Sequence, residues 1–424
     1  MTSRAMRPSY HGRIEWTNAG RRCGVYFADW YKKDVSLRWQ GGTWSLAVAQ
    51  ELFSSHEVDS GSLLLLRSLD IDALPARGCC LDYGCGYGVL GLAIGAARPA
   101  WEIVLIDRDA LAVAFSAHNA TALGIPARGI VALDPLDPDP DRAGYDLLLW
   151  NVPGKAGASV LDLLTDEALD VLAVDGVLAL VIVHPLAEIV RTAISRREDV
   201  ALVHESAGSD HTVLHVRRVS GAPTGSRDGF ADGVFDREPI EVVYGDVDYG
   251  LVPVIGLPQY DGPDQASLMM MDALSSLSLD AQGVQRAVVV RPGAGHLGMA
   301  VRSRWPAAMV TLVDRDLLAL RSSARALDSG VEAFATPDFD GLETGEPFDL
   351  ALATIPDQMR PPVMNRLLGD LIARVHPGGR LLIGGDSTEV SRFAGLAKKR
   401  AEVRVRDQRK RRGVSVAVIE RREG

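Results

Sequence analysis

The sequence predicts an α/β protein made of two tandem domains, each a doubly wound, mostly parallel sheet with an antiparallel edge. Three observations predict this fold. Short apolar runs typical of strands alternate with longer helical runs along the chain. A glycine-rich turn at residues 84–88 joins one such strand to the helix after it. The same order of features then recurs in the second half, which indicates an internal duplication.

The bulk composition narrows the class of protein. A chain of 424 residues is too long for one ordinary core, so two domains of roughly 200 residues are expected. A net charge of −10 gives no overall attraction to nucleic acid, although a local basic patch still allows it. The four cysteines lack paired ligand spacing, so neither disulfides nor a metal site is expected. Without a long apolar run or a signal-peptide core, the protein is expected to be cytoplasmic.

The first half alternates predicted strands and helices. The strands span residues 35–39, 43–48, 78–82, 101–107, 130–133, 145–150, 176–183 and 211–217. The helices span residues 63–69, 89–97, 110–123 and 160–172. The first two strands flank Gly41 and Gly42 and are expected to form a hairpin. The last strand alternates in polarity, as an antiparallel edge strand does.

Residues 219–235 are rich in glycine, serine and proline and are predicted to be a linker. The order of the first half returns after it. Strands are expected at 240–244, 251–255, 287–291, 311–314, 348–355, 378–383 and 414–419, with a second glycine turn at 292–295. The predicted domains are therefore 1–218, which binds a ligand, and 236–424, which is a degenerate copy.

Two acids and the first glycine turn outline the ligand site. Asp82 lies near the end of a strand before the turn, and Asp107 ends the next strand, about twenty residues on. Glycines let the backbone approach a ligand closely, and the helix N-terminus offers unpaired N–H groups. A carboxylate at the second position suits the hydroxyl pair of a ribose. This pattern predicts a cofactor that contains adenosine.

A dinucleotide and S-adenosylmethionine are the two alternatives for that cofactor. Residues 86–91 and 293–298 both match the dinucleotide fingerprint, but such turns are common in α/β proteins. S-adenosylmethionine accounts for more of the sequence, because Asp82 would then lie near its ammonium group and Asp134 near its adenine. It would also explain the polar stretch 151–153 at a strand end. We therefore expect S-adenosylmethionine.

The sequence resembles a known family at two places. Leu52-Phe53-Ser54 with the later Asp59-Ser60-Gly61-Ser62, and Leu81-Asp82-Tyr83-Gly84-Cys85-Gly86-Tyr87-Gly88-Val89-Leu90-Gly91, resemble the methyltransferase small domain family. The tandem layout is similar to the bacterial rRNA guanine-N2 methyltransferases of that family, which carry one cofactor-binding and one degenerate copy. The resemblance implies a class I methyltransferase fold in both halves and methyl transfer to an amine in the N-terminal half.

The resemblance also implies the roles of individual residues. The expected cofactor-binding residues are Asp82, Gly84, Cys85, Gly86, Tyr87, Gly88, Asp107, Arg108 and Asp134. The expected catalytic residues are Asn151, Val152 and Pro153, where a side-chain amide oxygen and a backbone carbonyl would hold an exocyclic amine. Phe53 and Lys155 are expected to contact the substrate. Phe53 and Asp59 could also cover the cofactor, or they could simply pack against and cap the following helix.

Two departures from the family pattern concern the substrate and the second copy. The family has an aromatic residue where this chain has Gly154, so Trp150, Tyr87 or Phe53 would have to supply the ring that stacks on a base. The family usually has the degenerate copy first, whereas here it comes second. In that copy Arg291 is expected at the place of Asp82, where its charge would repel a sulfonium cofactor. The second domain is therefore expected to be structural or to dock the substrate.

The sequence leaves several possible binding partners and methyl acceptors open. The C-terminal end is strongly basic, which favours contact with RNA phosphates. Its basic residues are Lys398, Lys399, Arg400, Arg404, Arg406, Arg409, Lys410, Arg411 and Arg412. A small molecule or a protein side chain as methyl acceptor is a second hypothesis, and a non-catalytic RNA-binding protein is a third. The sequence does not predict the oligomeric state.

Overall fold

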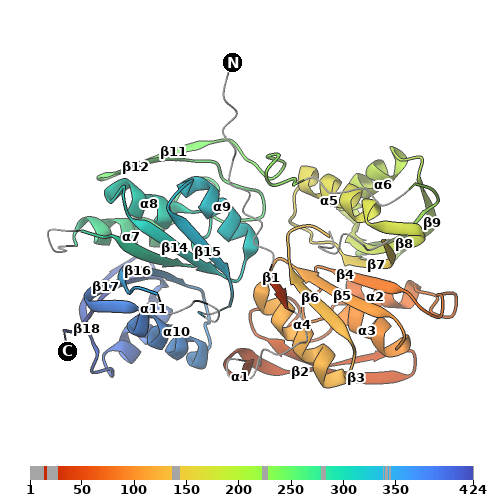
Figure 1. The fold of residues 1–424 in the computed structure, drawn as a ribbon, viewed down its shortest axis with the longest axis horizontal. Coiled ribbons are helices and arrows are strands. Elements are labelled where there is room, and N and C mark those ends of the chain that lie inside the picture. The colour runs from red at the N-terminus through yellow and green to blue at the C-terminus, as the bar shows by residue number, and fades with distance from the viewer. Residues whose placement is uncertain are drawn as a thin grey trace, which may run out of the picture.

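The computed structural model describes residues 27–135, 144–221, 228–277, 283–337, 339, 342 and 345–423, and the backbone of residues 14–16. Two α/β lobes lie side by side, the N-terminal one in red to yellow-green and the C-terminal one in green to blue (Figure 1). In the described residues no helix is both long enough and apolar enough to cross a membrane. The expected cysteine chemistry is testable only for Cys79, Cys80 and Cys85, which are free thiols. Cys23 lies outside the described residues.

The first sheet has the strand order β1-β6-β5-β4-β7-β8-β10-β9. Its strands are β1 (Ile14–Trp16), β4 (Cys79–Tyr83), β5 (Glu102–Asp107), β6 (Ala127–Val131), β7 (Tyr145–Asn151), β8 (Leu172–Val183), β9 (Val200–Ala207) and β10 (His211–Arg218). The helices of this half are α1 (Phe27–Trp30), α2 (Ser60–Ser68), α3 (Val89–Ala97), α4 (Ala110–Leu123), α5 (Ala158–Asp170) and α6 (Ala187–Ser195), with the short helix η1 (His184–Leu186). β10 runs antiparallel to β8, as the polarity pattern predicts.

The second sheet repeats this order as β15-β14-β13-β16-β17-β19-β18. Its strands are β13 (Arg286–Val290), β14 (Met309–Asp314), β15 (Val331–Ala335), β16 (Phe348–Ile355), β17 (Val375–Asp386), β18 (Val403–Arg411) and β19 (Val414–Arg421). Its helices are α7 (Gln265–Ser275), α8 (His296–Arg304), α9 (Leu317–Leu327), α10 (Pro361–Arg374) and α11 (Ser387–Ala397). The predicted duplication and fold class are confirmed.

A separate two-stranded hairpin precedes each sheet. The first is β2 (Tyr31–Trp39) with β3 (Gly42–Ala49), as expected. The second is β11 (Ile240–Tyr244) with β12 (Val247–Leu251), so the prediction of a strand over 251–255 is wrong. Gly245 has φ +62° and turns the chain directly after β11, which brings the second strand forward.

Two other features of the first half were not foreseen. The edge strand β9 was missed because most of its side chains are exposed, so it lacks an apolar pattern. The predicted linker contains the buried residues Phe230 and Phe235, and the guanidinium groups of Arg321 and Arg325 each lie 4.6 Å from the Phe230 ring. The described part of this segment therefore packs against α9. The domain boundaries themselves stay predictions.

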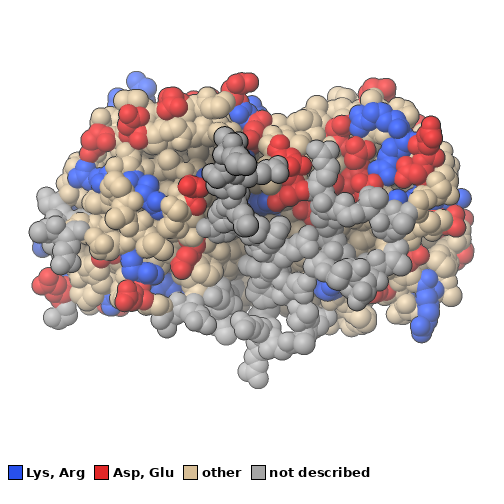
Figure 2. Space-filling model, turned by 45° about the horizontal axis from the view of Figure 1, so that its top comes forward, with Lys and Arg blue, Asp and Glu red and all other residues tan. Residues whose placement is uncertain are grey.

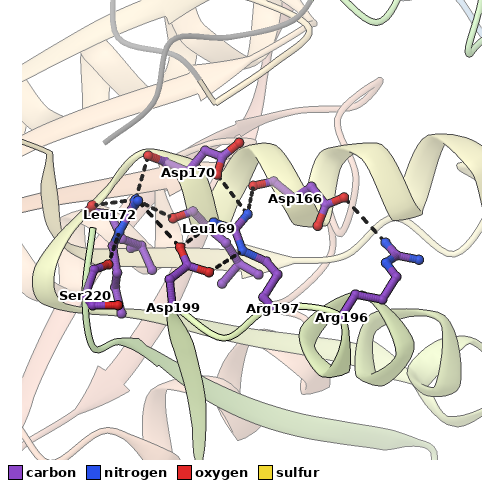
Figure 3. Close-up of polar contacts among 9 residues, drawn as sticks. Asp166, Leu169, Asp170, Leu172, Arg196, Arg197, Asp199 and Ser220 are labelled. Carbon is purple, nitrogen blue, oxygen red and sulfur yellow. Dashed lines mark hydrogen bonds and ion pairs between the residues drawn. The ribbon is translucent and has the colours of Figure 1, made fainter. Parts of the chain in front are cut away.

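Arg218, a buried arginine at the end of β10, connects this strand to the end of α5 and the start of β8. The Arg218 guanidinium donates to the carbonyl oxygens of Leu169 and Asp170, at the C-terminal end of α5, and of Leu172, the first residue of β8. Arg197 pairs with Asp170 and Asp199 beside it (Figure 3). These contacts fix the edge at which the parallel strands begin.

The position of the ligand site follows from the strand order. Along the sheet the order reverses at β4, since β5 lies on one side of it and β7 on the other. A doubly wound sheet leaves a crevice at the carboxyl ends of the strands at such a point. The glycine turn follows β4, Asp107 ends β5 and Asn151 ends β7, so all three lie at this crevice.

The two lobes meet through the same loop in each copy. Arg108 pairs with Asp316 at 3.2 Å, and Arg315 pairs with Asp109 at 3.2 Å. Backbone bonds cross in the same symmetrical way, from the Ala110 N–H to the Arg315 carbonyl and from the Leu317 N–H to the Arg108 carbonyl. The loop that carries Asp107 is therefore held by the second domain.

Candidate active site

The turn after β4 forms an open backbone cradle. Gly84 and Gly86 have φ values of +71° and +54°, which glycine adopts without steric strain. A Cβ atom built on either residue would meet no atom within 4 Å, so space lies directly above the backbone. Gly88 caps the N-terminus of α3, whose first N–H groups face the same turn. The cradle suits a ligand that lies against the backbone.

Asp82 lies beneath this cradle and is almost fully buried. Its Oδ2 accepts a hydrogen bond of 2.8 Å from the Gly91 N–H, while its Oδ1 is buried without a partner. Burial, with the nearby charge of Asp107, raises its pKa to about 7. An unpaired buried carboxylate oxygen is costly, so a cationic ligand group would stabilise it.

Asp107 closes the other side of the cradle. Its carboxylate accepts hydrogen bonds from the Gly86 N–H at 3.0 Å and the Asp109 N–H at 2.9 Å. Burial raises its pKa, and these backbone bonds oppose that shift. The side chain is therefore fixed in one orientation relative to the glycine turn.

The remaining predicted cofactor residues are placed differently from one another. Cys85 and Tyr87 are buried, and burial raises the pKa of both side chains. Asp134 follows β6 and is half-buried; burial, and next the charge of Asp134, raise the pKa of Tyr83. Arg108 is half-exposed and is engaged by the second domain, through Asp316 and the Gly256 carbonyl.

The hydrogen bonds of Asn151 indicate what kind of substrate group this site can bind. Its Nδ2 donates to Asp59 Oδ2 at 2.8 Å and to Ser62 Oγ at 3.0 Å. Asp59 is itself fixed, because it caps α2 by accepting from the Ser62 N–H at 2.9 Å. Both N–H bonds of the amide are used, so Oδ1 of Asn151 is left as an acceptor. An acceptor at this place selects a substrate group that donates a hydrogen bond.

The loop after Asn151 is short. Val152 is buried, and its N–H donates to the Val181 carbonyl. Pro153 and Lys155 are exposed, and the Pro153 carbonyl accepts from the Ala156 N–H at 3.2 Å. Ser62 was not predicted as a site residue, and Asp59 was considered only as a cover for the cofactor or as a helix cap, not as a partner of Asn151. The capping pattern at Asp59 was visible in the sequence, but its contact across 92 residues was not.

The three candidate aromatic residues are separated by their exposure. Trp150 is 1% exposed and packs against Tyr83, with ring centroids 5.3 Å apart. Tyr87 is 3% exposed, and its hydroxyl donates to the Ser54 carbonyl at 3.4 Å. Phe53 is 74% exposed. Of the three, only Phe53 presents a ring to an incoming substrate.

The second copy lacks the cofactor acid, but for a reason different from the expected one. β4 ends at Tyr83 and β13 at Val290, and the following helices are capped by Gly88 and Gly295. This register places Val289 opposite Asp82. Arg291, with φ +57°, takes the place of Gly84, so the prediction that it stands where Asp82 stands is wrong.

A pocket remains at the carboxyl end of the second sheet, but first-domain residues enter it. Arg291, Asp314, Arg315 and Trp30 are among the residues that line it. Glu51 of the first domain pairs with Arg291 at 3.3 Å and with Arg315 at 3.2 Å. Burial, together with the charge of Asp316, raises the pKa of Asp314 to about 6. Ion pairs between the domains thus occupy the arginines of this copy.

No group of acids, histidines and cysteines suited to a metal ion is found among the described residues.

Comparison with known proteins shows what parts of this chain are similar to. Residues 43–201 match the family model described as "Methyltransferase small domain". A ribosomal RNA small subunit methyltransferase C of Hamiltonella defensa is 34% identical over 146 residues, which are 33% of this chain and 42% of that protein. Its counterpart in Pseudomonas syringae pv. syringae is 34% identical over 176 residues, 39% of this chain and 51% of that protein. The matches thus span about half of these relatives or less.

One solved structure matches nearly the whole chain. It is a 16S rRNA N2 methyltransferase of T. thermophilus in complex with AdoMet and guanosine. It aligns with a TM-score of 0.63 and 19% identity, and covers 93% of this chain and 99% of its own. The likeness shows that the tandem fold is shared.

Proposed function

We propose that this protein transfers a methyl group from S-adenosylmethionine to the N2 amine of a guanine in ribosomal RNA, a proposal supported by the match of residues 43–201 to the methyltransferase small domain. The observation that carries the proposal is the fixed amide of Asn151, whose Nδ2 is occupied by Asp59 and Ser62. Its Oδ1 is available to accept a hydrogen bond from an exocyclic amine. The names of the relatives support rRNA guanine as the acceptor.

The residues around the glycine turn fit the cofactor. The unpaired Oδ1 of Asp82 is suited to its ammonium group, and the open backbone at Gly84 and Gly86 to its methionine part. Asp107, at the end of β5, would accept from the ribose hydroxyls, and Asp134, which follows β6, would lie near the adenine. When bound, the cofactor supplies an electrophilic methyl group on a sulfonium.

The catalytic work of the chain is then mainly orientation. Asn151 Oδ1 and the Val152 carbonyl hold the two N–H bonds of the amine, which aims the nitrogen lone pair at the cofactor side of the crevice. Positive charge develops on the amine as it reacts, and two oxygen acceptors stabilise that charge. Asp59 and Ser62 keep the Asn151 amide from rotating.

The second domain supports the first in this proposal. It holds the loop of Asp107 and offers basic side chains for RNA. Arg400, Arg406 and Arg409 are neutralised by neighbouring acids. Among the described residues, the other basic side chains of this end have no ion pair; they are Lys398, Lys399, Arg404, Lys410, Arg411 and Arg412. β18 is the outer edge strand of its sheet, far from the first lobe in Figure 1, so only a long RNA would reach both regions.

The surface charge agrees with a limited RNA footprint. On the face shown in Figure 2, the coloured basic and acidic side chains are interspersed, and they form no continuous basic field. We therefore expect weak general attraction to RNA and recognition concentrated near the site. A ribosomal substrate would also place the protein in the cytoplasm.

The proposal is tested by methyl transfer from labelled S-adenosylmethionine to 16S rRNA, to small ribosomal subunits and to a small-molecule cell fraction. We expect transfer to RNA and its recovery as N2-methylguanosine after nuclease digestion. Asn151→Ala should bind S-adenosylhomocysteine normally and lose transfer by about 100-fold. Label only in the small-molecule fraction would overturn the RNA acceptor. Full turnover by Asn151→Ala would remove the role of the amide.

A further inference from the structure

The segment 50–59, between β3 and α2, contacts both the glycine turn and Asn151. The Tyr87 hydroxyl of the glycine turn donates to the Ser54 carbonyl at 3.4 Å. At the other end, Asp59 accepts from Asn151 at 2.8 Å. Gln50 donates to the Gln358 carbonyl of the second domain at 3.2 Å. The segment is therefore held in place between the cofactor cradle and the catalytic amide.

Phe53 stands out on this segment. Its neighbours Leu52 and Ser55 are buried, whereas its own ring is 74% exposed. Among the described residues, Val243 is the other large apolar side chain exposed to this degree, at 75%. Burial of a phenylalanine is favourable, so folding alone gives no reason to hold this ring in water. An aromatic face held rigidly beside a binding site is suited to stacking on another ring.

Two lysines of β2 lie against the same segment. The Lys32 ammonium donates to Ser55 Oγ at 3.1 Å and lies 3.1 Å from His56 Nε2. The Lys33 ammonium donates to the His56 carbonyl. Glu51, two residues before Phe53, is occupied by Arg291 and Arg315 and so does not neutralise them. Two cations thus lie against the segment that carries Phe53, in a protein of net charge −10.

We propose that Phe53, Lys32 and Lys33 form an RNA-reading surface, on which a base of the bound single strand stacks on Phe53 while its phosphates meet the lysines. This inference rests on the proposed RNA acceptor and deepens it. Stacking on an aromatic side chain beside basic groups is the usual way in which proteins hold single-stranded RNA. Phe53 would supply the ring that Gly154 cannot, since Trp150 and Tyr87 are buried.

The first test measures binding and methylation of a short single-stranded RNA that contains the acceptor guanine. Phe53→Ala should weaken RNA binding and raise KM by roughly 5- to 150-fold, with S-adenosylhomocysteine affinity unchanged. Phe53→Trp should retain binding, because it keeps an aromatic face. Val243→Ala, which removes an equally exposed apolar side chain from β11, is the matched control and should change nothing. Equal KM values for wild type and Phe53→Ala would overturn the proposal.

The second test concerns the lysines. A double variant, Lys32→Gln with Lys33→Gln, should reduce the slope of log affinity against log salt by about 1.4, or about 0.7 for each phosphate contact. The control is Arg67→Gln with Arg217→Gln. Arg67 is in the last turn of α2, Arg217 is near the end of β10 that pairs with the start of β8, and both are exposed. A slope equal to that of wild type would remove the lysines from the surface.

A rescue separates stacking from a structural effect. A Cβ at Gly154 would lie 3.8 Å from Val183, an ordinary contact, and Gly154 has no positive φ. Gly154→Phe added to Phe53→Ala should therefore recover part of the lost affinity. Lack of any recovery counts against stacking. If wild type methylates RNA but Phe53→Ala is unaffected, only this surface fails; if wild type methylates no RNA, the proposed function fails as well.

Discussion

Asp82 shows how one buried side chain prepares a ligand site. Its carboxylate has one oxygen bonded to the Gly91 N–H and one without a partner. Burial makes the charged form costly, so its pKa is raised to about 7. In the free protein the proton bound near neutral pH compensates for that cost, and a cationic ligand group would replace the proton.

This argument predicts how S-adenosylhomocysteine affinity depends on pH. The pKa of Asp82 is about 7, so at lower pH its carboxyl is protonated and must lose a proton before it can accept the ligand ammonium. Affinity for S-adenosylhomocysteine should therefore fall roughly tenfold for each pH unit below 7. Calorimetric titration between pH 5.5 and 8.5 measures this. Asp82→Asn should bind weakly at every pH. Burial, together with the charge of Asp316, raises the pKa of Asp314 in the second copy to about 6, so Asp314→Asn is the control and should keep the wild-type profile.

The stability of the free protein should change with pH in the opposite sense. A raised pKa means that the folded state binds more protons than the unfolded chain between about pH 4 and pH 7. The contribution of Asp82 to the free energy of unfolding is therefore present at low pH and lost as pH rises through about 7.

If the affinity of wild type for S-adenosylhomocysteine did not change with pH, the Asp82 carboxylate would not contact the ligand ammonium.

At the scale of elements, the duplication supplies natural controls. Helices α2 and α7 begin in the same way, with Asp59 accepting from the Ser62 N–H at 2.9 Å and Asp264 from the Ser267 N–H at 2.8 Å. Only Asp59 also accepts from Asn151. A comparison of the two caps thus separates helix capping from orientation of the amide.

We predict that Asp59→Ala and Asp264→Ala lose about 1 kcal/mol of unfolding free energy each, because each removes an N-cap. Only Asp59→Ala should also lower kcat, by tenfold or more, since the Asn151 amide becomes free to rotate. Chemical denaturation and single-turnover methyl transfer measure the two effects. Equal turnover in the two variants would show that Asp59 is only a helix cap.

The elements also show what the sequence could and could not predict. The glycine turn, Asp82 and Asp107 were predicted because each depends on neighbours in the chain and on strand order. The pairing of Asn151 with Asp59 joins residues 92 positions apart, so no local pattern contains it. The place of Arg291 depended on where β13 ends, and strand ends are set by sheet pairing rather than by local propensity. The exposure of Phe53 likewise depends on what its segment packs against.

At the scale of the whole molecule, the second copy contacts the loop that carries Asp107 of the first copy's candidate site. Its cradle has an arginine in place of a glycine, and Glu51 of the first domain pairs with that arginine. The loops of Asp107 and Asp314 bind each other through crossed ion pairs and backbone bonds. The two copies therefore meet through equivalent loops.

The crossed ion pairs predict unequal effects of two equivalent arginines. Arg315 is 18% exposed and contacts both Glu51 and Asp109. Its removal leaves two mostly buried acids short of a partner, so Arg315→Ala should lower the free energy of unfolding by about 3 kcal/mol. Arg108 occupies the same place in the first copy but is 42% exposed, so Arg108→Ala should cost about 1 kcal/mol or less.

Urea denaturation of both variants measures this difference. Arg315→Ala should also weaken S-adenosylhomocysteine binding, because the Asp109 N–H that orients Asp107 lies in the loop that Arg315 holds. High salt should reduce the difference in unfolding free energy between the two variants only slightly, because Arg315 is largely shielded from solvent ions. Equal losses for Arg108→Ala and Arg315→Ala would mean that burial does not set the strength of these contacts. Unchanged ligand affinity in Arg315→Ala would show that the second domain does not support the first domain's site.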